Sequence, residues 1–406
     1  MEKTLKKPKV IIAMSGGVDS SVAAVLLKKQ GFDVTGVFMH FWSEEPARFA
    51  KIRQPAARRA EHAASHSARL AAKKLGIRFY TLNVVKEFKK AVVDYFLKEL
   101  KKGVTPNPCV VCNKEIKFKV LLKKAEQMGA DFVATGHYAR LWRETKNQKP
   151  KTKTYECHLL KAKDKNKDQS YFLYTINQSQ LARYLFPIGD YLKSEVRKMA
   201  KKMKLAAWDR PESQEICFIY DNDMKRFIKK HMDLTPGKII DTRGKIIGVH
   251  DGLPLFTIGQ RHGLGIGGGK PYYVVGTDYK THKLIVTSDP KDKLLWRKKL
   301  LVCDVNWISG NKPLKPFKCQ ATIRYRHKPE KAIVSPHTKR FGKGVKRKKG
   351  KGNDYEVIFS RPQRAITPGQ SVIFYRGNEV LGGGIIGCGQ GSESLAAFGN
   401  LSANSG

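Results

Sequence analysis

The sequence lacks the features that mark membrane-spanning and secreted proteins. It contains no run of about 18 apolar residues, the length that a membrane-spanning helix requires. Its first residues, MEKTLKKPK, form no apolar segment of the kind found in a secretory signal. The cysteines number seven, and an odd count without an export signal argues against a framework of disulfides. We therefore expect a protein of the reducing cytoplasm.

Acidic residues are scarce as well. Asp and Glu number 35 against 78 Lys and Arg, so the formal net charge is +43. This excess favours a polyanionic partner, nucleic acid above all, although a general basic bias of the source proteome would account for it equally well. The densest runs of lysine lie in predicted loops, at residues 146–153, 161–167 and 339–351. Such runs strengthen RNA binding without specifying it.

A chain of 406 residues is expected to form two or three domains. Over residues 1–217, strand-like and helix-like segments alternate, which predicts an α/β domain with a doubly wound parallel sheet. Strands are expected at 10–13, 34–39, 78–84 and 131–135, and helices at 20–27, 57–75 and 85–102. Ligands bind such sheets at the carboxyl ends of the strands.

The later part of the chain is dominated by short strands and glycine-rich turns. Residues 218–297 predict a small β-rich linking domain, with strands near 238, 246, 256–266, 272 and 284. Residues 298–388 carry evenly spaced strands near 300, 318–325, 355, 371 and 380, the pattern of a small β-barrel. The tail 389–406 is rich in Gly, Ser, Ala and Asn and is predicted to be disordered.

The stretch Met14–Ser21, MSGGVDSS, joins the first predicted strand to the first predicted helix. The N–H groups of a glycine loop and the positive end of a helix dipole together favour one anion. Gly16 and Gly17 would let the backbone approach phosphate oxygens, while Asp19 would hold Mg²⁺ or orient the loop. No Gly-Lys-Ser/Thr follows, so this is not a Walker A loop. The stretch could be an ordinary glycine turn between a strand and a helix. Its sequence, however, resembles the PP-loop of enzymes that cleave ATP to AMP and pyrophosphate.

Two cysteines stand where chemistry is expected. Cys112 lies in a segment whose two prolines predict a stiff loop rather than a helix, and Cys217 lies in a separate motif. Lys114 and Lys117 would lower the pKa of the Cys112 thiol and make it nucleophilic. One cysteine could carry a persulfide that delivers sulfur, and the other could release that sulfur by closing a disulfide.

Other interpretations of the cysteines stay open. Cys109 and Cys112 are spaced as half of a zinc site, although no second CxxC or pair of histidines accompanies them. Together with Cys217 they could ligate an iron–sulfur cluster that takes a fourth ligand of another kind, or all three could be structural. The remaining cysteines are expected to be small packing residues: Cys157, Cys303, Cys319 and Cys388.

Eight motifs, in this order along the chain, resemble those of the bacterial tRNA-specific 2-thiouridylase (MnmA) family of PP-loop ATP pyrophosphatases. The likeness extends from about residue 8 to 388. The motifs are SGGVDSS (15–21), TPNPxxxCNKEIKF (105–118), ATGHYAR (134–140), KDQSYFLY (167–174), SQEICFI (213–219), TIGQRHGLGIGGGKPYYVVG (257–276), IRYRH (323–327) and RAITPGQ (364–370).

The resemblance implies an enzyme that uses ATP, with Mg²⁺, to thiolate the wobble uridine of tRNA. ATP would adenylate the uridine 2-oxygen with loss of pyrophosphate, which converts a poor leaving group into AMP. A persulfide sulfur, supplied by a cysteine desulfurase or a relay protein, would then attack C2. The base must leave the stack of the anticodon loop to reach the site, so the two β-rich domains and their lysines would clamp the tRNA.

The resemblance also implies roles for particular residues. Cys217 would bear the persulfide and Cys112 would be the partner nucleophile. The ATP site would comprise Ala13, Met14, Ser15, Gly16, Gly17, Val18, Asp19, Ser20, Met39 and Gly136. The tRNA-contacting positions would be Asn107, Pro108, Cys109, His137, Lys167, Asp168, Gln169, Arg324, Tyr325 and Gln370. Taken alone, His137 could instead cap the sheet edge, and the Arg-Tyr pair could be an exposed part of a strand.

Two features depart from the family's pattern. Cys109 stands where many relatives carry an aspartate that is a candidate acid/base, so that role is dispensable, or Cys109 performs it, or the three thiols bind a cluster. Residues 43–66 are basic and cysteine-free where relatives carry acidic residues and cysteines. Rival functions are an amidotransferase-type PP-loop synthetase, an iron–sulfur-dependent tRNA thiolase and a non-catalytic RNA-binding protein. The paired cysteines argue against the first, and the intact loop argues against the last.

Overall fold

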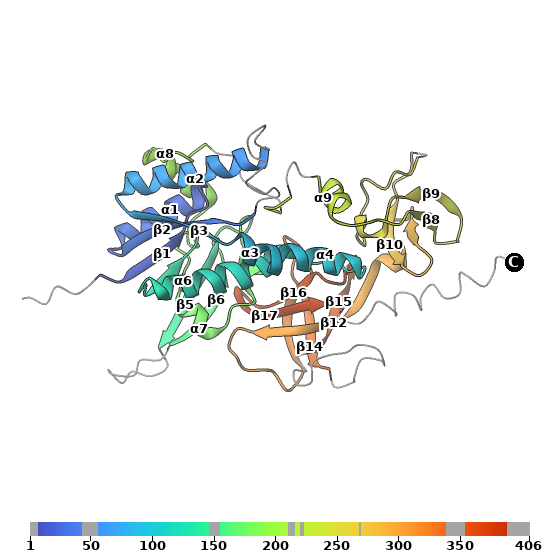
Figure 1. Cartoon of the computed structure of the whole chain (residues 1–406). Coiled ribbons are helices and arrows are strands. Elements are labelled where there is room, and N and C mark those ends of the chain that lie inside the picture. The colour runs from blue at the N-terminus through green and yellow to red at the C-terminus, as the bar shows by residue number, and fades with distance from the viewer. Residues whose placement is uncertain are drawn as a thin grey trace, which may run out of the picture.

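Three sheets organise the computed structural model of the chain (Figure 1). It describes residues 7–42, 56–145, 155–209, 216–219, 223–267, 269–337 and 354–387, with the backbone alone for 56–60. In the view of Figure 1 a parallel sheet lies on the left, a barrel lies below the centre and a small sheet lies on the right. The predicted tail 389–406 and the lysine runs 146–153 and 339–351 lie outside the described residues.

The first sheet has five parallel strands in the order β3-β2-β1-β4-β7. Side chains alternate between its two faces: Ile11 of β1 packs into one core, whereas Val10 and Ile12 pack into the other. Burial on both faces explains why these strands are continuous apolar runs, and the predicted doubly wound sheet is confirmed. The bounds are β1 Lys9–Ala13, β2 Asp33–His40, β3 Arg78–Asn83, β4 Phe132–Ala134 and β7 Tyr184–Leu185.

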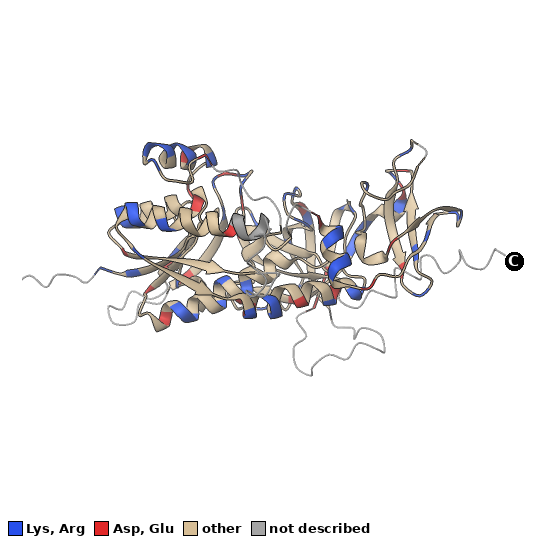
Figure 2. Ribbon diagram, turned by 45° about the horizontal axis from the view of Figure 1, so that its top comes forward, with Lys and Arg blue, Asp and Glu red and all other residues tan. Residues whose placement is uncertain are grey.

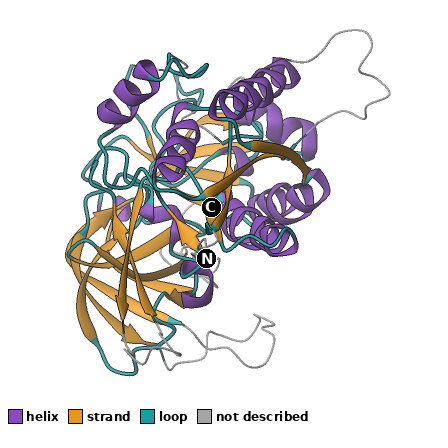
Figure 3. Ribbon diagram, turned by 90° about the vertical axis from the view of Figure 1, so that its left-hand side faces the viewer, coloured by secondary structure: helices purple, strands orange, loops and turns teal. Residues whose placement is uncertain are grey.

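Helices cover both faces of this sheet, as Figure 3 shows. One face carries α1 (Val18–Lys29), α2 (Ala56–Leu75) and α8 (Lys193–Lys202), whose apolar residues share a core with Val10 and Ile12. The other face carries α3 (Val85–Phe88), the π-helical segment Lys89–Val93, α4 (Asp94–Lys101) and α6 (Leu121–Gln127). The predicted helix 85–102 is therefore present, with a π-helical stretch inside it.

The cysteine segment is helical, which contradicts the predicted stiff loop. α5 spans Pro108–Val111, and the π-helical segment Cys112–Val120 continues it to α6. Pro108 occupies the first position of the helix, where its missing N–H would have had no partner in any case. Asn107 caps the helix by accepting a hydrogen bond from Val110 N–H at 3.3 Å. Proline excludes a helix interior and not a helix start, and for that reason the prediction was wrong.

The C-terminal region is a closed antiparallel barrel, as predicted. Its order is β12-β15-β14-β13-β16-β17, and a β12–β17 pairing closes it. β14 was missed, and the predicted strand 318–325 ends at Thr322. The bounds are β12 Trp296–Trp307, β13 Phe317–Thr322, β14 Glu330–Pro336, β15 Tyr355–Arg364, β16 Ser371–Arg376 and β17 Glu379–Ile386.

A hairpin from the first region extends the barrel sheet. β5 (Ala139–Thr145) and β6 (Tyr155–Lys161) are antiparallel, and β6 pairs with β17 at Leu160 and Glu379. The largest core cluster accordingly extends from Ile11 of β1 to Val380 of β17. The chain then forms a 3₁₀ turn (Ser170–Leu173) and α7 (Gln178–Leu181). The first region and the barrel thus share packing, and the predicted boundaries 1–217, 218–297 and 298–388 stay predictions.

The central region holds a four-stranded sheet in the order β10-β11-β8-β9, preceded by α9 (Met224–His231). Its strands are β8 Gly237–Asp241, β9 Ile246–His250, β10 Tyr273–Asp278 and β11 Lys283–Thr287, with 3₁₀ turns at Leu253–Leu255 and Lys293–Leu295. The stretch predicted as a strand at 256–266 is irregular, because its glycines at 259, 263 and 265 adopt positive φ.

Basic residues are distributed over helices and sheets alike (Figure 2). No helix within the described ranges combines the length and the apolar character needed to cross a bilayer.

Candidate functional site

The glycine loop after β1 is shaped by its own serines. Ser20 Oγ accepts a hydrogen bond from Ser15 N–H (3.1 Å) and lies 3.4 Å from Gly17 O. Ser21 Oγ donates to the same carbonyl at 2.9 Å. These bonds fold the loop into the first turn of α1. As a result Ser20 and Ser21 are buried, whereas Ser15 is exposed where an anion would arrive.

Two glycines let this loop pack against its neighbours. Gly16 has φ +76°, and a Cβ there would lie 2.0 Å from the carbonyl oxygen of Ala64 in α2. A Cβ at Gly136, just after β4, would lie 2.7 Å from the backbone nitrogen of Ser20. The carboxyl ends of β1 and β4 therefore meet at the start of α1, and Met39 is buried at the end of β2. The predicted ATP residues gather at one edge of the sheet, as the topology requires.

Asp19 is held by two side chains that the motifs did not single out as partners. Lys193 Nζ, from the start of α8, lies 2.6 Å from Asp19 Oδ1, and the Tyr138 hydroxyl donates to the same oxygen at 2.9 Å. Lys193 is buried, while the Asp19 carboxylate keeps about a third of its exposure, 32%. The expected role of Asp19 in orienting the loop therefore has a structural basis.

We expect Lys193→Met to destabilise the protein and to weaken ATP binding. The variant leaves a partly buried carboxylate without its cation, which costs about 1–3 kcal/mol after allowance for the exposure of Asp19. Urea unfolding and ATP titration would measure the two effects. Lys198→Met, an exposed lysine on the same helix, is the control. Equal stability of the two variants would show that the ion pair contributes nothing.

Both predicted sulfur-transfer cysteines lie near the same edge of the sheet. Phe218 anchors Cys217, because its buried ring packs against Trp42, just past β2, at 6.5 Å and against Phe88 at 5.8 Å. The cysteine helix packs against the loop after β4, where the rings of Phe118 and His137 lie 6.1 Å apart. Cys112 is buried, Cys109 is half-buried and Cys217 is exposed, and all three are free thiols.

The surroundings raise the thiol pKa values, which contradicts the predicted lowering. Burial raises the pKa of Cys112 from its ordinary value of 9.0 to about 11, and Lys117 opposes this shift only in part. Burial also raises the pKa of Cys109. Although the Cys217 side chain is exposed, the protein around it raises its pKa through desolvation, and the thiolates of Cys112 and Cys109 add to the shift. At neutral pH the three thiols are therefore protonated.

Among the described residues, Lys117 is the lysine whose charge opposes the rise in the thiol pKa values, and Lys114 has no such effect. We expect Lys117→Met to slow alkylation of Cys112 by iodoacetamide roughly three- to tenfold at pH 8, because losing the charge raises the thiol pKa further. Peptide mapping by mass spectrometry would measure the rate. In the wild type the rate should rise tenfold per pH unit without a plateau below about pH 11. Lys114→Met, at an exposed position, should leave it unchanged, and equal rates in both variants would contradict the prediction.

The donor geometry bears on the metal alternatives. Among the described residues, three donor atoms within 4.8 Å of one another occur at Glu144, Glu156 and His158, and not at the three thiols. Sulfur ligands of one zinc ion need such closeness. A larger iron–sulfur cluster separates its ligands more widely, so the cluster alternative is left to experiment.

Most residues predicted to contact tRNA near the sheet already have protein partners. His137 is buried with Nδ1 2.8 Å from Thr135 Oγ1, and burial keeps its pKa well below the ordinary value. Asp168 accepts hydrogen bonds from Ala162 N–H and Ser170 N–H, at 2.9 and 3.2 Å. Gln169 exchanges two bonds with the backbone of Tyr138. Lys167 is half-buried, and the tRNA contacts stay a prediction.

The remaining predicted contacts lie at the barrel. Arg324 is exposed in a turn after β13, and not in a strand, while the Tyr325 ring lies 4.6 Å from that of Phe172. Gln370 donates to the backbone carbonyls that directly precede Asn107, Pro108 and Cys109. The predicted tRNA contacts on the barrel and those on the cysteine segment therefore lie near each other. Of the basic segment 43–66, residues 56–66 are described, and the side chains of His62 and His66 are exposed.

Sequence reasoning missed the residues that support the site. Lys193 carries no local signal of its role, because it acts through contact with a distant segment. Phe218 lies inside the motif 213–219, but its packing against Trp42 and Phe88 could not be read from that motif. Tyr138 and Tyr171 lie inside recognised motifs, so their phenol groups were available as a signal. The buried strand cysteines Cys157 and Cys303 confirm their predicted packing role, Cys319 is half-buried, and Cys388 lies outside the described residues.

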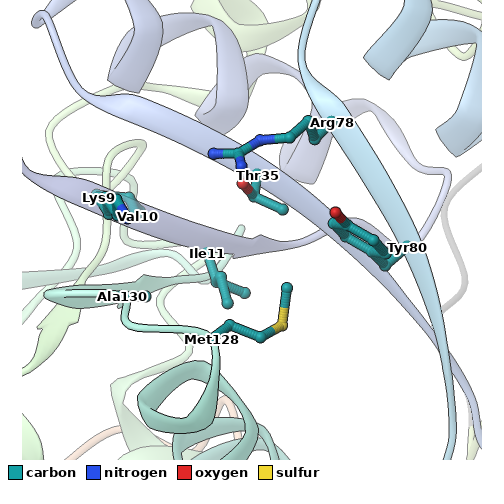
Figure 4. A pocket seen from close by; sticks show the side chains of 8 residues that line it. All are labelled: Lys9, Val10, Ile11, Thr35, Arg78, Tyr80, Met128 and Ala130. Atoms are coloured by element: carbon teal, nitrogen blue, oxygen red, sulfur yellow. The ribbon is translucent and has the colours of Figure 1, made fainter.

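A separate pocket of about 240 Å³ lies on the parallel sheet (Figure 4). Lys9, Thr35 and Arg78 line it at the starts of β1, β2 and β3, and Ala130 lines it just before β4. These are the amino ends of the strands, so the pocket lies at the edge opposite the glycine loop and is no part of the site.

Models of three successive domain families match the chain. They are a tRNA methyl transferase HUP domain over residues 8–221, a tRNA methyl transferase PRC-barrel domain over 225–288 and an aminomethyltransferase β-barrel domain over 297–386. The protein is thus of the class that joins a HUP domain to two β-rich domains.

Full-length relatives define the family within that class. The tRNA-specific 2-thiouridylase MnmA of Carboxydothermus hydrogenoformans is 42% identical over 382 residues, 94% of this chain and 98% of the relative. That of Roseiflexus sp. is 44% identical over 391 residues, 93% of this chain and 99% of the relative. The chain belongs to the MnmA family of tRNA-specific 2-thiouridylases. A solved 4-thiouridine synthetase–RNA complex with bound ATP covers 55% of this chain and 50% of its own, at 16% identity and a TM-score of 0.34, too distant a likeness to bear on the site.

Proposed function

We propose that the protein is a tRNA-uridine 2-sulfurtransferase that thiolates the wobble uridine at the expense of ATP. One observation carries the proposal: the glycine loop and the two segments that bear Cys112 and Cys217 lie at the same edge of one sheet, in a chain of the MnmA family. ATP must activate the uridine 2-oxygen, and sulfur must then attack C2, the carbon that bears this oxygen. An enzyme for this reaction therefore needs both groups on one side of the sheet.

In the first half-reaction the uridine 2-oxygen attacks the α-phosphorus of ATP and pyrophosphate leaves. The loop N–H groups, the exposed Ser15 hydroxyl and the N-terminus of α1 would bind the phosphates. Asp19 is the residue suited to a magnesium ion, which would supply charge neutralisation at the phosphates. Its bonds to Lys193 and Tyr138 would fix its direction.

In the second half-reaction the terminal sulfur of a Cys217 persulfide attacks C2, and AMP leaves with the former 2-oxygen. The Cys112 thiolate then attacks Sγ of Cys217, a Cys112–Cys217 disulfide forms, and the electron pair of the broken S–S bond passes to the sulfur on C2. A dithiol reductant would reopen the disulfide. The pKa of Cys112, about 11 at rest, keeps this thiol protonated until the substrate or a base draws off its proton.

The partners follow from this chemistry. tRNA is the substrate, and the net charge of +43 suits its phosphates. The sulfur donor would be a cysteine desulfurase or relay protein that presents a persulfide to the exposed Cys217. The free thiols suit a reducing cytoplasm. The target base would have to leave the anticodon stack to reach a site set in the sheet edge.

The test is a reconstituted assay with unmodified tRNA, ATP, Mg²⁺, a cysteine desulfurase and cysteine, run in air and anaerobically with iron quantified. The expected result is ATP-dependent 2-thiouridine in iron-free protein. An iron–sulfur-dependent thiolase, with the three thiols as cluster ligands, would instead require iron and anaerobic handling. Pyrophosphate release without any 2-thiouridine would contradict both.

A further inference from the structure

The side-chain amide of Gln370, in the barrel, hydrogen-bonds the backbone just before the helix that bears Cys109 and Cys112. Gln370 donates through Nε2 to Thr105 O at 2.9 Å and to Pro106 O at 3.4 Å. Thr105 N–H donates in return to Pro368 O at 3.0 Å. The turn before β16 is therefore fastened to residues 103–107, which we call the clasped segment.

The clasped segment is closely packed against both the barrel and the central region. Gly369 has φ +89°, and a Cβ there would lie 2.2 Å from Val104 Cγ1. The central region contacts the same segment: Thr257 Oγ1 lies 3.3 Å from Thr105 Oγ1, and a Cβ at Gly103 would lie 2.5 Å from the ring of Tyr279. The barrel and the central region thus both contact one segment of the first region. In Figure 1, helix α4, which directly precedes this segment, lies close to the barrel and to the small sheet.

The position of the clasped segment determines the position of the two thiols that follow it. Its last residue, Asn107, caps α5 through the bond from Val110 N–H at 3.3 Å. The Asn107 side chain also hydrogen-bonds the Tyr171 hydroxyl, which donates to Ser371 O at 3.0 Å, one residue beyond Gln370. Cys109 lies on the first turn of this capped helix, and Cys112 follows on the next. A shift of the clasped segment would therefore move both thiols relative to Cys217, which a different part of the chain anchors.

We propose that Gln370 is a positioning residue for sulfur transfer: it ties the barrel to the clasped segment and so sets the place of Cys112 relative to Cys217. The proposal deepens the proposed function and rests on it. It also adds to the role expected for this residue, because the amide nitrogen of Gln370 is engaged with two backbone carbonyls of the protein itself. The barrel then has two tasks, which are to contact the substrate and to hold the nucleophile.

Gln370→Leu, Gln370→Lys and Gln178→Leu form the matched set for a test. Leucine removes the N–H donors at similar volume, whereas lysine restores an N–H donor on a long side chain. Gln178 is the control, because its Nε2 also bonds the barrel, at Ile308 O (3.0 Å), but does not touch the clasped segment. The first readout needs neither tRNA nor ATP: diamide oxidises the free protein, and mass spectrometry times the formation of the Cys112–Cys217 disulfide.

We expect the disulfide to form about tenfold more slowly in Gln370→Leu, with most of the rate restored in Gln370→Lys and unchanged in Gln178→Leu. Equal rates in Gln370→Leu and the wild type, or equal slowing in Gln178→Leu, would overturn the proposal. Because this readout involves no thiolation, it stands even if the wild type makes no 2-thiouridine, a failure that would refute the proposed function instead.

The second readout separates positioning from substrate contact in the thiolation assay. For Gln370→Leu we expect kcat for 2-thiouridine to fall about 10- to 100-fold, while KM for tRNA and tRNA-dependent pyrophosphate release stay within about twofold. A raised KM for tRNA with kcat unchanged would overturn the proposal and assign Gln370 to tRNA binding.

Discussion

Replacing Gly16 by alanine should abolish ATP-dependent pyrophosphate release, with a loss of at least about 10²-fold. A Cβ at this position would lie 2.0 Å from the carbonyl oxygen of Ala64 and 2.7 Å from its carbonyl carbon. These are backbone atoms of α2, which cannot turn aside as a flexible side chain would. The loop must therefore move, and with it the N–H groups and the Ser15 hydroxyl that would face the phosphates.

The control for this variant is already present in the chain. Gly31, at the end of α1, has φ +87°, close to the +76° of Gly16, but a Cβ there would have nothing within 4 Å. Gly31→Ala therefore carries the backbone strain alone, about 1 kcal/mol, and should keep the release rate. Pyrophosphate release with tRNA present and urea unfolding would be measured for both. If Gly16→Ala kept its rate, or if both variants lost it equally, close packing of the loop against α2 would not be what the reaction needs.

The sheet and its loop could be predicted because their determinants are local. The apolar run 10–13 is long enough for a strand and too short for a helix, and the serines and Asp19 that follow favour a helix start. Gly16 and Gly136 were recognised as loop residues from their sequence context. That a Cβ at either would strike another element follows only from the packed structure.

The parts that escaped prediction depend on distant contacts or on a balance of opposing effects. Lys193 is one lysine among many in the sequence, and its pairing with Asp19 needs α8 to pack beside α1. The pKa of Cys112 is raised by burial and lowered by Lys117, and sequence alone reveals the lysine but not the burial. The pairing of the hairpin β5–β6 with the barrel could not be predicted either, because its partner β17 lies more than two hundred residues later in the chain.

In a single turnover without added dithiol, serine at Cys112 or at Cys217 should reduce 2-thiouridine formation at least about 10³-fold, for different reasons. Without the Cys217 sulfur no persulfide can form, so no sulfur reaches the tRNA. Without the Cys112 sulfur the persulfide can still attack C2, but nothing breaks the resulting S–S bond. Cys112→Ser should therefore accumulate tRNA joined to Cys217 through a disulfide, which a non-reducing gel would reveal and a dithiol would release.

The remaining cysteines make the result specific. Cys319→Ser, on β13 of the barrel, should keep wild-type thiolation, and all variants should still release pyrophosphate. Cys109→Ser distinguishes the two thiolation chemistries: it should be active if Cys109 only lines the site, and inactive if three thiols hold a cluster.

Because the Cys112 pKa is raised, only about one thiol in a thousand is ionised at pH 8, so release of the tRNA adduct should accelerate as the pH rises toward about 11. A release rate that did not depend on pH would mean that another group attacks Cys217.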